Sequence, residues 1–415
     1  MAAEFQAWPL VEPFDHSAAA WAGLELAPVT VARLSGPSGL HSRTCYSWRQ
    51  GADRLVAFGQ RRPGTGQEKL WGFTGQPELA AGLLEGIGRR LTDQGLIAAK
   101  LELPTPDPPV HRQHPPHSSP RSVPAAPVAS GSIPADLTPP ASPTSSGPVL
   151  SGSVPADPMA AALAAAALAQ GYEPLPGPRE GLVGVVPPGL DPPTAPTDPP
   201  TALARFWRRP SRSAGDYLRQ STPFTCGPAA ALMALSALGR TGAGDRSHEL
   251  SLWRQANSHP GCDPFGLAVA LAGEGVSARV SVSYPDTYQK PAEAWLVELR
   301  DWFQRDFAAR AQDLGLVVER RWVELAEVAA WLSEGALVLA LIDEFPFHGR
   351  HTLHWILLYG LAGPDHVMVQ DPWTQDEQGE TWVDAQALPV TWAGLDRLTR
   401  FCPQSWRACL VLDGR

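Results

Sequence analysis

Short runs of strand-forming residues predict strands in the first hundred residues. Residues Thr44–Gln50 and Arg54–Gln60 are two such runs on either side of a short glycine-containing turn, which favours a hairpin. Apolar residues then recur at helical spacing at Leu79, Leu83, Leu84, Ile87 and Leu91. Gly95 ends the predicted helix, and Ile97–Leu103 follows as a strand. Residues 1–103 are therefore expected to form a small α+β domain, whose role the pattern does not indicate.

Two further patterns lie in the last two hundred residues. Ala229–Leu238 consists of strong helix formers ending before Gly239, which predicts a helix. One face of that helix is apolar, through Leu232, Leu235 and Leu238, so we expect it to be buried. Trp355–Tyr359 and His366–Gln370 predict two apolar strands of a hairpin. Together the patterns predict a second α+β unit over residues 201–415.

Composition separates these two units. Of the 44 prolines, 26 lie in residues 101–200, where Tyr172 is the only aromatic residue. Such a segment does not bury enough apolar surface to offset the entropy of the chain. We therefore expect residues 104–200 to be a disordered Pro/Ala-rich linker. Ala160–Ala169 favours a transient helix at most, because it has no polar face to specify docking.

Charge and cysteine content limit the partners and the cellular compartment that we expect for this protein. The net charge is −9 and there is no long run of basic residues, so we expect no nucleic-acid partner. Five scattered cysteines favour a reducing compartment over a disulfide framework. No signal peptide is evident, and no apolar run reaches the ~18 residues that span a bilayer. A cytoplasmic protein without a membrane span is the expectation.

The strongest candidate for chemistry is Cys226, directly before the predicted buried helix. The N-terminus of a helix favours a thiolate, and a free thiol is only a few per cent ionised at neutral pH. By itself the position also fits a small packed residue at a helix cap. Gln220, six residues earlier, can donate its side-chain amide to an oxyanion together with the Cys226 backbone N–H.

A histidine and an aspartate flank the predicted hairpin. If the turn closes symmetrically, His354 lies directly opposite Asp371, on the same face of the sheet. The imidazole then donates Nδ1–H to the carboxylate and leaves Nε2 for a thiol. This inference depends on register, because a slip of one residue separates the two faces. His351 is a competitor, but the residue opposite it is Thr374.

A metal site is the weaker interpretation of the histidines. His348, His351 and His354 are spaced three apart, but Pro346 and Gly349 argue against the helix that would bring them together. We expect no metal and no cofactor. Cys262, before a predicted helix over Phe265–Ala272, is expected to be a packing residue.

The order of these motifs resembles a known family. Gln220, then Cys226-Gly-Pro, His354-Trp and Asp371-Pro resemble the papain-like peptidases of the double-glycine leader-peptidase group, family C thirty-nine, and its stand-alone bacterial relatives. The resemblance covers roughly residues 214–412. It implies a papain-like fold with Cys226 as nucleophile, His354 as base, Asp371 as its orienting partner and Gln220 as oxyanion donor.

The sequence thus predicts a cysteine peptidase or related thiol hydrolase acting on peptide or amide bonds of a peptide or protein substrate. Two alternatives stay open. The first is a peptide-binding module with the same fold and no turnover. The second is an acyl transferase or cyclase, in which an amine or an internal nucleophile replaces water in the second half-reaction.

Overall fold

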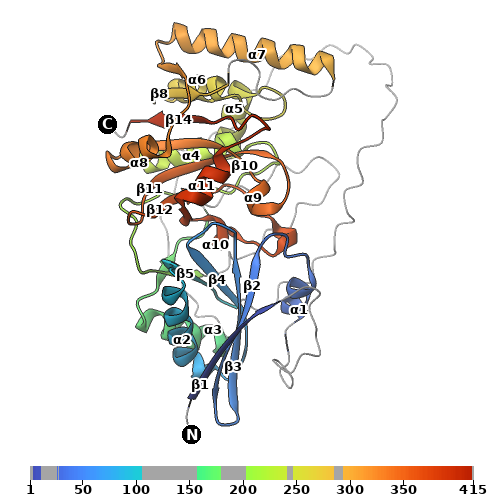
Figure 1. Cartoon of the computed structure of the whole chain (residues 1–415), viewed down its shortest axis with the longest axis vertical. Helices are drawn as coiled ribbons and strands as arrows, with labels where there is room; N and C mark the ends of the chain where they lie inside the picture. The colour runs from blue at the N-terminus through green and yellow to red at the C-terminus, as the bar shows by residue number, and fades with distance from the viewer. Residues whose placement is uncertain are drawn as a thin grey trace, which may run out of the picture.

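The computed structural model describes residues 3–10, 26, 28–104, 157–178, 202–240, 246–284 and 293–413. They form two sheet-based units stacked along the long axis of the molecule (Figure 1). The predicted α+β class is confirmed. Most of the predicted linker, residues 105–156 and 179–201, lies outside the described residues. No helix within the described ranges combines the length and the apolar character needed to cross a bilayer.

The N-terminal unit is built on a seven-stranded sheet of order β1-β2-β3-β4-β5-β7-β6. Its strands are β1 (Ala3–Leu10), β2 (Ser42–Gln50), β3 (Asp53–Arg61), β4 (Gln67–Gly75), β5 (Ala98–Glu102), β6 (Glu173–Leu175) and β7 (Ala202–Phe206). Its helices are α1 (Pro28–Ser35), α2 (Ala80–Asp93), which follows a 3-10 turn at Pro77–Leu79, and α3 (Pro158–Ala169). The predicted hairpin, helix and last strand are present, and β4 is an additional strand.

Helix α3 corrects the expectation for Ala160–Ala169. Leu163 and Ala167 are fully buried in the same core as Leu83 and Ile87 of α2. An alanine-rich helix needs no polar face to dock here, because its small side chains pack directly on an apolar neighbour. Part of the predicted disordered linker is therefore a packed element of the N-terminal unit.

The predicted boundary at residue 201 is also wrong. Strand β7 (Ala202–Phe206) pairs antiparallel with both β5 and β6 and so completes the N-terminal sheet. The short apolar run of β7 carries no local sign of the strand with which it pairs, so its position in the chain alone favours the second unit. The C-terminal unit begins after this strand.

The C-terminal unit is built on a second seven-stranded sheet, of order β13-β12-β11-β10-β14-β8-β9. Its strands are β8 (Ala278–Val282), β9 (Val318–Arg320), β10 (Leu337–Asp343), β11 (Leu353–Leu361), β12 (His366–Gln370), β13 (Leu388–Thr391) and β14 (Ala408–Leu412). Its helices are α4 (Cys226–Ala237), α5 (Arg246–Ala256), α6 (Pro264–Gly273), α7 (Ala294–Asp313), α8 (Leu325–Ser333), α9 (Phe345–His348), α10 (Trp382–Ala385) and α11 (Trp392–Thr399), with a 3-10 turn at Asp376–Gln378.

This sheet is buried on both faces. In β10 and β11 the odd-numbered residues, such as Leu339 and Leu357, join a core with α4 and α6. Even-numbered residues, such as Val338 and Ile356, join a second core with α8 and α11. Two buried faces explain why these strands are almost continuously apolar in sequence, although the sheet is mainly antiparallel.

The register of the β11–β12 hairpin differs from the symmetric closure. Leu357 pairs with Gln370 and Leu358 with Val369, and an irregularity follows before Gly360. Near the start of β11 the pairing is shifted by two residues relative to the symmetric closure. His354 is therefore not directly opposite Asp371. A shift of two preserves the face on which each side chain lies, whereas a shift of one would have exchanged it.

Buried cations join the two units. Lys69 and Lys100, two of the three lysines of the chain, are fully buried. Lys69 pairs with Asp384 and donates to the Gly379 carbonyl oxygen at 3.0 Å. Lys100 donates to the Val383 carbonyl oxygen at 2.9 Å. The N-terminal unit therefore holds the segment that leads from β12 to β13.

Candidate active site

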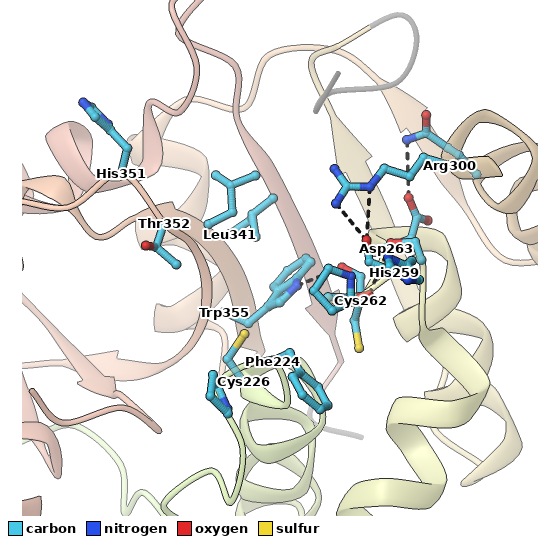
Figure 2. Close-up of a pocket in the computed structure, with 16 residues that line it drawn as sticks. Phe224, Cys226, His259, Cys262, Asp263, Arg300, Leu341, His351, Thr352 and Trp355 are labelled. Carbon is cyan, nitrogen blue, oxygen red and sulfur yellow. Dashed lines mark hydrogen bonds between the residues drawn. The ribbon is translucent and has the colours of Figure 1, made fainter. Parts of the chain in front are cut away.

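Cys226 is the first residue of α4 and lies in the wall of a pocket of about 250 Å³ (Figure 2). The helix starts here because Pro228 suits a first turn, where no intrahelical N–H bond is required. As in any helix, the first N–H groups of α4 have no acceptors within the helix itself. The Cys226 side chain is mostly covered, with 6% of the residue exposed.

His354 and Asp371 form a buried pair. The Nε2 atom of His354 lies 2.8 Å from Oδ1 of Asp371. The predicted pairing is therefore present, but the predicted ring orientation, with Nδ1 toward the carboxylate, is wrong. The two-residue register shift explains the difference. Asp371 follows β12 as a diagonal neighbour of His354, and Nε2 lies farther along the ring than Nδ1, so it spans this longer separation.

The other side of the His354 ring faces an acid and the thiol. Nδ1 lies 3.5 Å from Oε1 of Glu344, which precedes α9. Burial alone lowers the pKa of His354, but the carboxylates of Glu344 and Asp371 and the contact with Cys226 outweigh burial and raise this pKa well above its usual value. The imidazole is therefore held in its charged form beside the sulfur.

Asp371 is held as a carboxylate. Burial alone raises its pKa, but Arg62 and then His354 lower it from 3.8 to about 2. The backbone N–H of Trp373 also donates to Oδ1, at 2.9 Å. In addition, the hydroxyl of Tyr217 donates to the Asp371 carbonyl oxygen at 2.9 Å and fixes the backbone at this position.

Gln220 lies next to the same segment. Its backbone N–H donates to the carbonyl oxygen of Pro372 at 2.9 Å, and its side-chain amide donates to the carbonyl oxygen of Thr222 at 2.7 Å. A side-chain amide has two N–H donors, so the predicted oxyanion role requires the second one. Gln220 is buried on the loop that leads into α4.

Comparison with known families adds to this geometry. Residues 215–413 match the family model described as "Peptidase_C39 like family". The match supports a relationship between the C-terminal unit and C39-like peptidases, and the N-terminal unit lies outside the matched residues. No curated protein matches the chain.

The pocket of the C-terminal unit has two contrasting ends. Phe224 and Trp355 line it beside Cys226, whereas Asp263 and Arg300 line it farther away (Figure 2). The Asp263 carboxylate accepts from the backbone N–H groups at the start of α6, so it caps that helix. His354, Asp371 and Gln220 are not among the residues that line this pocket.

Cys262 lies in the same pocket wall and is 3% exposed. It stands directly before the N-cap of α6, which spans Pro264–Gly273 where a helix over Phe265–Ala272 was predicted. Burial raises the pKa of the Cys262 thiol well above its usual value. The pocket therefore contains two cysteines, and burial keeps Cys262 in its neutral, less nucleophilic form.

Sequence reasoning missed the acids and the arginine around His354 and Asp371. Glu344 contacts His354 from the end of β10, and Arg62 reaches Asp371 from the N-terminal unit, with Nη1 2.6 Å from Oδ2. Glu380 pairs with Arg62 in turn. No sequence spacing connects Arg62 with Asp371, because they lie 309 residues apart. Glu344 is closer to His354 in sequence, but nothing in the strand pattern distinguishes it.

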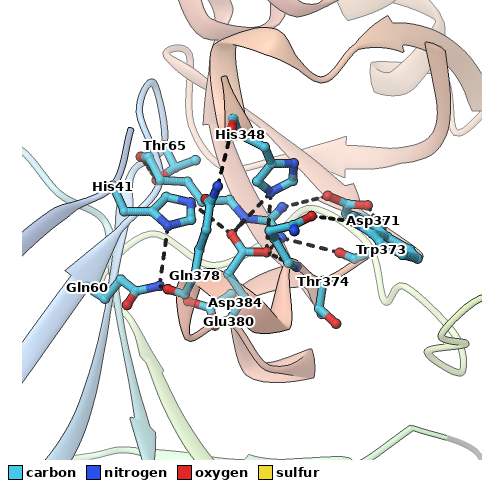
Figure 3. A network of polar contacts seen from close by, with 12 residues as sticks. His41, Gln60, Thr65, His348, Asp371, Trp373, Thr374, Gln378, Glu380 and Asp384 are labelled. Carbon is cyan, nitrogen blue, oxygen red and sulfur yellow. Dashed lines mark hydrogen bonds and ion pairs between the residues drawn. The ribbon is translucent and has the colours of Figure 1, made fainter. Parts of the chain in front are cut away.

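The histidines proposed as metal ligands do not converge. His351 pairs with Asp343 at 2.7 Å and is exposed, whereas His348 turns toward Glu380. His348, His41 and Glu380 do form a buried group with the spacing of metal ligands (Figure 3). However, both carboxylate oxygens of Glu380 already accept from the guanidinium of Arg62. The guanidinium of Arg62 already offsets the charge of Glu380, so ion pairing and hydrogen bonding explain the group.

Proposed function

We propose that the C-terminal unit is a papain-like cysteine peptidase or a related thiol hydrolase that acts on peptide or amide bonds. The observation that carries the proposal is the buried hydrogen bond between His354 and Asp371 together with the influence of Cys226, in the pocket wall, on the charge of the same imidazole. A thiol, an imidazole and a carboxylate in this order are the groups of nucleophilic acyl transfer.

A cationic ring and a helix N-terminus lie at the sulfur of Cys226. The raised pKa of His354 keeps a proton on the ring, and the positive end of α4 points at the sulfur of Cys226. We propose that the sulfur attacks as the thiolate, which a neighbouring cation and a helix N-terminus stabilise, so the attack on the carbonyl carbon needs no proton abstraction by the ring. This modifies the role expected from the sequence: His354 acts first as a general acid.

The proposed reaction uses these groups in turn. The sulfur of Cys226 adds to the substrate carbonyl, and the oxyanion accepts from the Cys226 backbone N–H and the Gln220 amide. Collapse of the tetrahedral intermediate breaks the C–N bond, and His354 gives its proton to the leaving amine. The ring, now neutral, takes a proton from water as water attacks the thioester, and the C–S bond then breaks to release the carboxylic acid and return the Cys226 thiolate beside the imidazolium. Asp371 keeps the ring oriented throughout.

Alkylation tests the activated thiol. At pH 6–7, iodoacetamide is expected to modify Cys226 in the parent chain, and Cys226→Ala should abolish that labelling. The matched control is Cys262→Ala, because this second thiol lines the same pocket but is held neutral by burial. Equal labelling of the parent and Cys226→Ala, read by peptide mass spectrometry, would show that the reactive thiol lies elsewhere.

Turnover separates a hydrolase from a binding module. A chromogenic thioester or amide should give a burst of product equal to the enzyme concentration, followed by steady release as water attacks the acyl enzyme. Cys226→Ala should give neither phase. Binding of a peptide without release of product would support the peptide-binding alternative. Product carrying an added amine in place of water would support a transferase.

A further inference from the structure

Arg62 connects the N-terminal unit to the centre of the candidate site. It directly follows β3, and only 3% of the residue is exposed. Its Nη1 donates to Oδ2 of Asp371 at 2.6 Å. Its Nε and Nη2 donate to the two oxygens of Glu380 at 2.5 and 2.6 Å, and Nη2 also donates to the Trp373 carbonyl oxygen at 3.3 Å. The guanidinium therefore has acceptors on all three nitrogens.

The Asp371 carboxylate is held on both oxygens by partners from two different units. Oδ1 accepts from His354 and from the Trp373 backbone N–H, both within the C-terminal unit. Oδ2 accepts from Arg62 of the N-terminal unit. A carboxylate with both oxygens engaged has no freedom to rotate about its Cβ–Cγ bond. Without Arg62, Oδ2 of Asp371 would be a buried charged atom that lacks this donor. The plane of the carboxylate group relative to the imidazole of His354 would then no longer be fixed.

We propose that Arg62 is a positioning residue for the candidate triad, supplied by the N-terminal unit and acting through Asp371. The inference rests on the proposed function, because it assigns Arg62 a purpose within that site. It also gives the N-terminal unit, whose role the sequence does not indicate, a place in the chemistry: one of its side chains completes the site.

Arg62 itself is rigidly supported. The carboxylate of Glu380 lies 3.0 Å from Nε2 of His41 and 3.3 Å from Nε2 of His348, so both units surround it (Figure 3). The backbone N–H of Gln375 donates to Glu380 Oε2 at 2.7 Å. The Arg62 guanidinium also lies over the ring of Phe347, 5.2 Å from its centroid. A bidentate, stacked arginine in such a setting presents its remaining N–H in one direction.

Other interface cations do not share this placement. Lys69 and Lys100 reach Asp384 and backbone carbonyl groups, and neither contacts the triad. Their arrangement is explained by holding the two units together. Arg62 differs because one of its donors ends on the carboxylate that orients His354.

The charges around Asp371 predict how a variant that lacks the Arg62 guanidinium would respond to pH. The groups that face it are His354 from β11, Arg62 from the N-terminal unit, the Tyr217 hydroxyl on its carbonyl oxygen and, through Arg62, Glu380. Burial raises the pKa of Asp371, and Arg62 is the partner that lowers it most. Without the arginine this pKa rises, so the carboxyl group takes up a proton at higher pH. A protonated Asp371 no longer stabilises the imidazolium.

The test is the rate of Cys226 alkylation by iodoacetamide from pH 4 to 9, measured on the full chain. Arg62→Met is expected to lower this rate at pH 6 by at least about tenfold and to move the acid limb of the profile upward, toward that of Asp371→Asn. Arg61→Met removes a neighbouring charge that does not contact Asp371, and its profile should superimpose on that of the parent. Arg62→Lys, which retains the charge without the planar fork, should fall between them.

Superimposed profiles of Arg62→Met and Arg61→Met would overturn the proposal, as would an unchanged profile of Asp371→Asn. If Arg62→Met does not fold, by circular dichroism, Arg62→Lys decides in the same way: an intermediate profile supports the proposal and one matching Arg61→Met overturns it. Peptide hydrolysis by the parent is measured separately. A parent that is alkylated with the expected Arg62 dependence but hydrolyses nothing would refute the proposed function and leave the positioning role supported.

Discussion

Replacing Leu163 by alanine tests whether α3 is a packed part of the N-terminal unit. Leu163 is completely buried against α2, although it lies in a segment whose composition favours disorder. The change removes three buried carbon atoms, which at about 0.8 kcal/mol each amounts to roughly 2.4 kcal/mol of lost transfer free energy. The cavity left behind adds to this, so we expect the free energy of unfolding to fall by about 2–5 kcal/mol.

The same helix provides a matched control. Leu168 carries an identical side chain but is 52% exposed, so Leu168→Ala should change the unfolding free energy by no more than about 0.5 kcal/mol. Urea unfolding followed by circular dichroism measures the difference between the two variants. Hydrogen exchange of the peptide covering residues 158–169 measures it locally, and exchange in Leu163→Ala should be at least roughly thirtyfold faster than in the parent.

The comparison between the two leucines decides the matter. Equal unfolding midpoints and equal exchange rates for Leu163→Ala and Leu168→Ala would refute the packing of α3. Residues 157–178 would then behave as the composition alone predicts. A loss confined to Leu163→Ala would establish that an alanine-rich helix closes this core.

Two buried carboxyl groups predict pH effects of opposite sign. The pKa of Asp371 is lowered to about 2, so its contribution to stability is complete above about pH 4 and is lost as the pH falls through 2. Between pH 5 and 2, urea unfolding of Asp371→Asn should therefore lose about 2 kcal/mol less than that of the parent. Burial raises the pKa of Asp263 to about 7, so the parent loses stability as the pH rises from about 4 to 7. Asp263→Asn keeps an oxygen that caps α6 and should be more stable than the parent by roughly 2–4 kcal/mol at pH 8, with no gain at pH 4. An equal gain at both pH values would contradict this assignment.

Local patterns in the sequence were sufficient for several parts of the structure. The helix that begins at Cys226 was predictable because alanine and leucine favour helices wherever they occur in a run, and because proline suits a first turn. The strands of the hairpin were predictable from continuous apolar runs separated by a turn. The candidate residues Cys226, His354 and Asp371 could be named for the same reason, since each stands at the end of a locally defined element.

Long-range contacts decided the rest. Hairpin register depends on packing against the whole sheet, so the shift of two residues and the resulting ring orientation of His354 could not follow from the turn alone. The docking of α3 depends on an apolar surface formed by another helix. The arginine beside Asp371 comes from a separate unit, and no local pattern records which charges will meet when two units bury a common surface. Propensity acts between near neighbours in the chain, whereas these features depend on which surfaces become buried together.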